Sequence, residues 1–154
     1  MMRLLVVVLA AVALHPALAA PTRSLPVQRV VVETPRGVHT FRMEIAADDE
    51  SRNRGLMFRR HLARDTGMLF DFQRPVMTAF WMKDTPLPLD IIFVRSDGIV
   101  ISVAPHAVPF SKAEITSPEP VRAVIEINGG EASALGIEPG ARVRAAAFGN
   151  LSTR

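Results

Sequence analysis

Prolines and glycines interrupt this chain so often that they leave room for short secondary-structure elements only. The 154 residues include 12 prolines and 9 glycines, and proline disrupts helices and central strands because it lacks the backbone N–H group. The runs between these breaks are rich in Val, Ile, Phe and Thr, which favour strands. The sequence therefore predicts a mainly β protein of the α+β type.

The predicted elements are too many and too short for a helical fold. A capped helix is expected at 48–58, where Asp48 or Asp49 precedes a run of basic residues, and a Gly-opened helical turn at 129–137. The segment 105–120 carries four prolines and is predicted to be a long loop. Strands are predicted at 27–33, 38–46, 67–72, 78–83, 90–95, 98–104, 121–127 and within 139–148. About eight short strands with one or two short helices predict a compact β-barrel or sandwich.

The first twenty residues, MMRLLVVVLAAVALHPALAA, have the pattern of a secretory signal peptide: one Arg, an apolar run, and the small residues Ala17 and Ala19. An uncleaved membrane anchor is the alternative, but the run is shorter than the roughly 20 apolar residues that span a bilayer. We expect residues 1–20 to be removed, followed by a tail at 21–27 and a single β-rich domain at 28–150. The mature protein is then periplasmic or extracellular and has no stable membrane insertion.

Composition excludes several functional classes. The chain has no cysteine, so a lipid-modified N-terminal cysteine, a thiol nucleophile, a zinc–thiolate site and CxxC redox chemistry are all excluded. The net charge is +3, and it falls to +2 if Arg3 leaves with the signal peptide. A charge this small predicts no nucleic-acid partner.

Several motifs resemble, in the same order, those of a bacterial and archaeal family known as domain of unknown function 192. They are Arg54 to Arg59 (RGLMFR), Gly67 to Phe70 (GMLF), Phe80 to Val94, Asp97-Gly98, and VIEINGGEASALGIEPG at 124–140. The resemblance spans roughly residues 28–148. It implies a β-rich and often exported protein, and it implies no particular reaction.

Residues 80–94, FWMKDTPLPLDIIFV, place charged groups in a very hydrophobic part of the chain. If strands 78–83 and 90–95 are antiparallel neighbours, Lys83 and Asp90 face each other and close a hairpin as a cross-strand ion pair. Under this interpretation the charges are structural.

The same stretch also predicts a ligand site. Trp81 could form the floor of a shallow cleft whose rim carries Lys83, Asp84 and Asp90. An aromatic face beside carboxylates suits a sugar ring, so the expected ligand is an unknown small molecule or an envelope glycan, and the protein a binding or accessory module. The alternative is a small hydrolase that uses Asp84 or Asp90 as acid and base.

Two further clusters have ordinary structural explanations. The basic residues Arg52, Arg54, Arg59, Arg60, His61 and Arg64 could bind anionic lipid headgroups, but we favour a solvated face paired with Asp48, Asp49 and Glu50. Met57, Met68, Met77 and Met82 could bind copper, but methionines among Leu and Phe commonly fill cores. We therefore expect no metal and no cofactor.

Overall fold

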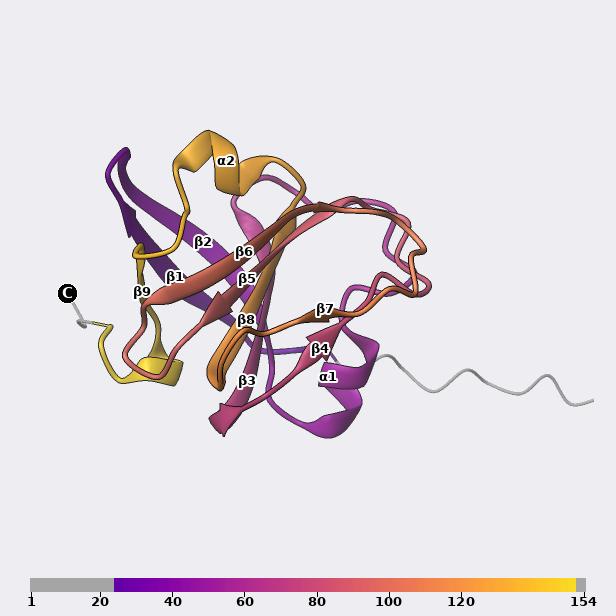
Figure 1. Ribbon diagram of the computed structural model, residues 1–154, viewed down its shortest axis with the longest axis horizontal. Helices are drawn as coiled ribbons and strands as arrows, with labels where there is room; N and C mark the ends of the chain where they lie inside the picture. Colours follow the sequence, from indigo (N-terminus) through magenta and orange to yellow (C-terminus); the bar gives the residue numbers. More distant parts are fainter. Residues whose placement is uncertain (1–23, 152–154) are drawn as a thin grey trace, which may run out of the picture.

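A computed structural model describes residues 24–151, so the predicted signal peptide at 1–20 lies outside the described residues. Seven strands form one curled sheet in the order β6-β5-β8-β3-β2-β1-β9, and β4 and β7 form a second, small sheet (Figure 1). The elements are β1 (Val27–Thr34), β2 (Gly37–Ala46), α1 (Asp49–Arg54), β3 (Thr66–Val76), β4 (Ala79–Phe80), β5 (Leu89–Val94), β6 (Val100–Ala107), β7 (Ile115–Thr116), β8 (Val121–Asn128), α2 (Glu131–Leu135), β9 (Arg142–Arg144) and the 3-10 helix η1 (Ala146–Phe148). The predicted fold class is confirmed.

Two local hairpins join strands that the sequence predicted as neighbours in the chain. β1 and β2 pair in antiparallel register up to Thr34 opposite Gly37, so Pro35 and Arg36 make the turn. β5 and β6 are likewise antiparallel, and the backbone N–H of Gly98 donates to the carbonyl of Arg95 in the turn between them. In both cases a glycine with positive φ follows or ends the turn, as tight turns require.

The large sheet curls until its two ends meet. β9 at one end bonds to the chain entering β6 at the other: Val100 N–H donates to the Ala141 carbonyl over 2.9 Å, and Val143 N–H to the Gly98 carbonyl over 2.7 Å. These bonds occupy backbone groups that an open edge would expose. The result is a curled half-barrel with a packed interior.

Hydrophobic clusters cover both faces of the curled sheet, and β8 contributes to each. Ile125 and Ile127 belong to the cluster that includes α2, whereas Val124 belongs to the cluster beneath α1 and the small sheet. Side chains of a strand alternate between faces, so Glu126 shares the face of Val124. Figure 1 shows α1, β4 and β7 grouped on one side of the molecule.

Helix α1 is shorter than predicted. Asp48 caps the helix. Its Oδ1 accepts the backbone N–H of Ser51 over 2.8 Å, and the Ser51 hydroxyl oxygen accepts the backbone N–H of Asp48. The helix ends at Arg54 because Gly55 adopts a positive φ. The predicted cap is confirmed, but residues 55–58 are a turn.

Two predicted strands are wrong in extent. The segment 78–83 contributes only Ala79–Phe80, which pair with Ile115–Thr116 inside the predicted long loop. The predicted closing strand is limited to Arg142–Arg144 and is followed by η1. Among residues 24–151, no helix is both long and apolar enough to cross a membrane.

Candidate functional site

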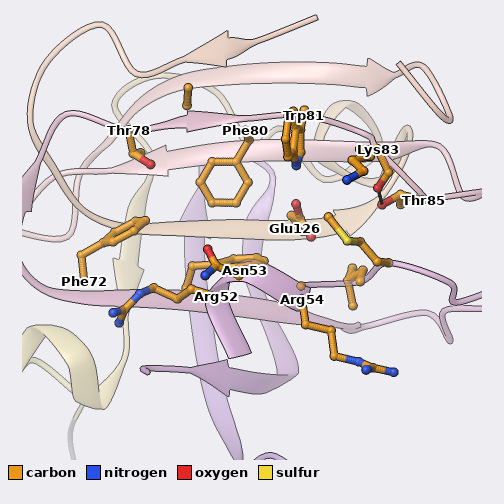
Figure 2. A pocket seen from close by; sticks show the side chains of 15 residues that line it. Arg52, Asn53, Arg54, Phe72, Thr78, Phe80, Trp81, Lys83, Thr85 and Glu126 are labelled. Carbon is orange, nitrogen blue, oxygen red and sulfur yellow. Dashed lines mark hydrogen bonds between the residues drawn. The ribbon is translucent and has the colours of Figure 1, made fainter. Parts of the chain in front are cut away.

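A pocket of about 480 Å³ lies between α1, the small sheet and the face of the large sheet that carries Glu126 (Figure 2). This volume is in the range of sites for small molecules, about 300 to 1,000 Å³. The lining residues come from four parts of the chain: Arg52, Asn53, Arg54, Gly55, Leu56 and Met57 of α1 and its C-terminal turn, Phe70 and Phe72 of β3, Thr78, Ala79, Phe80, Trp81, Lys83 and Thr85, and Glu126 of β8.

Glu126 is a buried acid among apolar neighbours. It is 5% exposed, and its direct cross-strand partners are Met68 on β3 and Ile91 on β5, which are both fully buried. Within residues 24–151 its carboxyl group makes no hydrogen bond and no ion pair. Burial disfavours the charged form and raises the pKa of Glu126 to about 8. The carboxyl is therefore largely protonated at pH 7 and can both donate and accept a hydrogen bond.

Aromatic rings form the walls around this carboxyl. Phe80 packs edge-to-face on Phe70, with ring centroids 4.9 Å apart, and on Phe93 at 6.3 Å. Trp81 lies at the rim and is 46% exposed. In Figure 2, Phe80 and Trp81 stand on one side of Glu126 and the α1 residues on the other. The pocket thus combines aromatic walls with polar lining groups, and Glu126 lies at its base.

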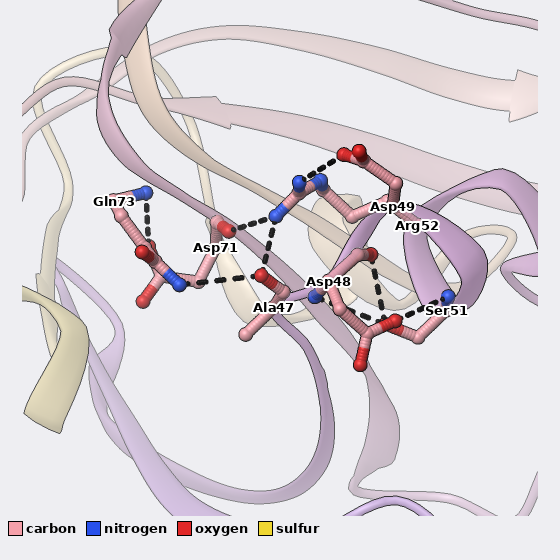
Figure 3. A network of polar contacts seen from close by, with 7 residues as sticks. All are labelled: Ala47, Asp48, Asp49, Ser51, Arg52, Asp71 and Gln73. Carbon is pink, nitrogen blue, oxygen red and sulfur yellow. Dashed lines mark hydrogen bonds and ion pairs between the residues drawn. The ribbon is translucent and has the colours of Figure 1, made fainter.

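Arg52 lines the pocket, but its guanidinium already binds other groups of the protein (Figure 3). Nη1 donates to the carbonyls of Ala47 and Asp71 over 2.6 and 2.9 Å, and Nη2 contacts Asp49 Oδ1 at 2.6 Å. The guanidinium also lies 5.7 Å from the ring centroid of Phe72. Arg52 therefore joins α1 to the residue that follows β2 and to β3, and it holds one wall of the pocket.

Lys83 and Arg54 remain available at the rim. The Lys83 ammonium lies 5.5 Å from the Trp81 ring centroid, a cation–π contact. Within the described part of the chain, neither Lys83 nor Arg54 makes a side-chain hydrogen bond or ion pair. The two cations can therefore bind a ligand without first breaking an existing pair.

Backbone hydrogen bonds hold the turn at 82–85 in place. The N–H of Phe58 donates to the Asp84 carbonyl over 2.7 Å, and the N–H of Phe110 to the Thr85 carbonyl over 3.1 Å. Asp84 adopts a φ of 55°, a conformation that Asp tolerates better than most residues. This turn places Lys83 over the pocket.

The predicted hairpin between 78–83 and 90–95 is wrong, and so is the ion pair between Lys83 and Asp90. Both edges of β5 are already occupied, one by β6 and the other by β8, so the segment 78–83 has no edge to join. Asp90 is fully buried instead. Its two oxygens accept the backbone N–H groups of His106, Gly130 and Ala132 over 2.8 to 3.0 Å.

The structure brings two of the four predicted site residues together. Trp81 and Lys83 line the pocket, whereas Asp84 and Asp90 do not. Glu126 does line it, and our sequence prediction did not include this residue. The available signal was a single acidic residue between Ile125 and Ile127, inside the apolar part of the strand that begins at Ala123.

Ion pairs and packing account for part of the other two predicted clusters. In the basic segment Arg52 pairs with Asp49, and Arg59 forms two bonds with Glu44, while Arg60 is exposed. Of the methionines predicted to fill the core, Met68 and Met82 are buried, but Met77 is 61% exposed. The prediction for Met77 is wrong because β3 carries the chain to the surface before this residue.

Comparisons with known proteins agree on a family and a fold. The family DUF192, described as Uncharacterized ACR, matches residues 30–145. A Sinorhizobium meliloti 1021 protein described as a candidate transcription regulator is 43% identical, with a TM-score of 0.79 over 82% of this chain and 98% of that one. A Novosphingobium aromaticivorans DSM 12444 protein of unknown function is 42% identical, with a TM-score of 0.77 over 88% of this chain and 94% of that one. Among curated proteins, none matches the chain.

Proposed function

The chain belongs to the DUF192 family, and we propose that it is an exported binding module of the cell envelope. Its pocket takes a small ligand, which is a glycan unit or another small envelope compound. Residues 1–20 support export, because they carry the charge, apolar run and small residues of a signal peptide. N-terminal sequencing of the protein from the envelope fraction tests this part: the expected start is Ala20 or Pro21, and a chain starting at Met1 contradicts export with cleavage.

The observation that supports ligand binding is the unpartnered carboxyl of Glu126 at the base of the pocket. Buried polar groups are nearly always hydrogen-bonded, and exceptions need an explanation. The sheet could accommodate an apolar side chain at this position, since Met68 and Ile91 flank it. A ligand that completes the hydrogen bonds of Glu126 explains why an acid is placed there.

A sugar ring fits this combination of groups. One face of a pyranose presents mainly C–H groups, which can pack on an aromatic ring such as Trp81. A hydroxyl both donates and accepts hydrogen bonds, which matches the protonated carboxyl of Glu126. Aromatic walls with one or two polar groups are typical of small-molecule sites.

Hydrolysis by Asp84 or Asp90 has less support. Glycoside hydrolysis commonly needs two carboxyl groups on either side of the scissile bond, and Glu126 is the one carboxyl that lines the described pocket. The carboxylate of Asp90 already accepts hydrogen bonds from three backbone N–H groups. Binding is the function that the geometry favours.

Ligand-induced thermal stabilisation of the mature protein tests the binding function. N-acetylglucosamine, glucose and glucuronic acid serve as probes, and a ligand that binds the folded state raises Tm with concentration. We expect at least one probe to raise Tm, and we expect Glu126→Met to abolish the shift without lowering the Tm of the free protein. Glu138→Met is the matched control, because Glu138 is exposed and lies outside the pocket. A shift that survives in Glu126→Met contradicts the assigned site.

A further inference from the structure

We propose that the pocket selects an anionic sugar, whose negative group binds Lys83 with Arg54 nearby while a ring hydroxyl reaches Glu126. This inference rests on the proposed function and specifies its ligand class. It follows from the excess of positively charged over acidic side chains among the residues that line the pocket.

Most of the charged side chains that line the pocket are positive. Three cations line it, Arg52, Arg54 and Lys83, and the acid that lines it is Glu126. The guanidinium of Arg52 is already bound to two backbone carbonyls and to Asp49. Two positive charges therefore remain without an opposing carboxylate, and a ligand that supplies a negative charge is complementary to them.

Lys83 is the cation best placed to meet such a ligand. In Figure 2 its amine points toward the space that Glu126 also faces, while the Arg54 guanidinium extends farther out. Lys83 and Glu126 line the same pocket and form no ion pair with each other, so one ligand can contact both. An anion at Lys83 gains a charge-assisted hydrogen bond, which is stronger than a bond between neutral groups.

The apolar walls restrict the rest of the ligand. Phe80 and Trp81 supply aromatic surface beside Glu126, so the ligand needs a compact body with an apolar face. A simple inorganic anion would leave these walls uncovered. A sugar with one acidic substituent meets all three conditions: the negative group, the apolar face and the hydroxyl.

A matched series of three sugars tests the inference by titration calorimetry at pH 7 and low salt. Glucose, glucuronic acid and glucose 6-phosphate differ only at C6, which carries a neutral, a carboxylate or a phosphate group. We expect at least one acidic sugar to bind about tenfold or more tightly than glucose. The member that binds tighter identifies carboxylate or phosphate as the preferred group, and either result supports the inference.

Two lysine variants complete the test. Lys83→Met should remove the preference for the acidic sugar over glucose, because the cation that binds the negative group is lost. Lys112→Met should leave this preference unchanged, since Lys112 is exposed and outside the pocket. If glucose binds as tightly as both acidic sugars, the inference is wrong while the binding function stands. If none of the three binds, both the anionic-sugar inference and the glycan form of the proposed function are overturned.

Discussion

Glu126 on β8 lies directly opposite Ile91 on β5 in the antiparallel pair, and Ile91 is fully buried. Met68 occupies the equivalent position on the other side, in β3. An acid between two buried apolar residues loses most of its hydration, which is the physical cause of its raised pKa.

The first prediction concerns the pH dependence of stability. Burial raises the pKa of Glu126 from 4.5 to about 8, so between these values the unfolded chain binds fewer protons at this position than the folded chain. The free energy of unfolding therefore falls as pH rises from about 4.5 to about 8, by up to about 5 kcal/mol from this group. Glu126→Gln cannot ionise and should gain stability relative to wild type over this pH range.

Urea unfolding at pH 5 and pH 9 measures this difference. We expect the gain of Glu126→Gln over wild type to be several kcal/mol larger at pH 9 than at pH 5. Glu138→Gln serves as the control and should give the same difference at both pH values. An equal effect of Glu126→Gln on stability at the two pH values would show that folding does not raise the pKa of this carboxyl.

The second prediction separates Asp90 from Lys83. Asp90→Ala leaves the N–H groups of His106, Gly130 and Ala132 without their acceptor, so it should cost about 3 to 5 kcal/mol. Lys83→Met removes only a cation–π contact with Trp81 and should cost about 1 kcal/mol or less. The double variant should show the sum of the two, and a coupling above about 0.5 kcal/mol in denaturant unfolding would contradict the separation.

The third prediction tests the packing beneath the pocket. A Cβ added at Gly67 would lie 2.2 Å from the backbone oxygen of Glu126 and 2.9 Å from Met43 Sδ, so β3 and β8 would have to separate. Gly67→Ala should therefore cost about 3 kcal/mol or more. Gly149→Ala has open space around it and should cost only about 1 to 2 kcal/mol from its positive φ. Similar losses for the two variants in thermal unfolding would refute this packing.

Features set by nearby residues could be predicted from the sequence. The hairpin ending at Thr34 and Gly37 depends on a local turn, and the helix cap at Asp48 depends on residues within three positions. Local turn and capping chemistry is readable because few alternative partners compete. The mainly β class followed from the same short-range patterns.

Features set by distant residues could not be predicted in this way. Asp90 accepts N–H groups from residues 16, 40 and 42 positions later in the chain, and Ala79–Phe80 pair with a strand inside a proline-rich loop. The candidate site required the same long-range knowledge, because Trp81, Lys83 and Glu126 meet only after the sheet curls. An acidic residue among the apolar residues at 123–127 was the one local sign of Glu126.

The titration of the Glu126 side-chain carboxyl by NMR, with carbon-13 at Cδ, tests the central claim most directly. The signal is followed from pH 4 to pH 10 in the free protein and again with saturating glucuronic acid, and Glu126→Gln provides its assignment. We predict a midpoint near 8 in the free protein and a change in both chemical shift and midpoint when the sugar binds. A midpoint near 4.5 with no response to the sugar would contradict a buried, protonated acid that serves as the ligand contact of this pocket.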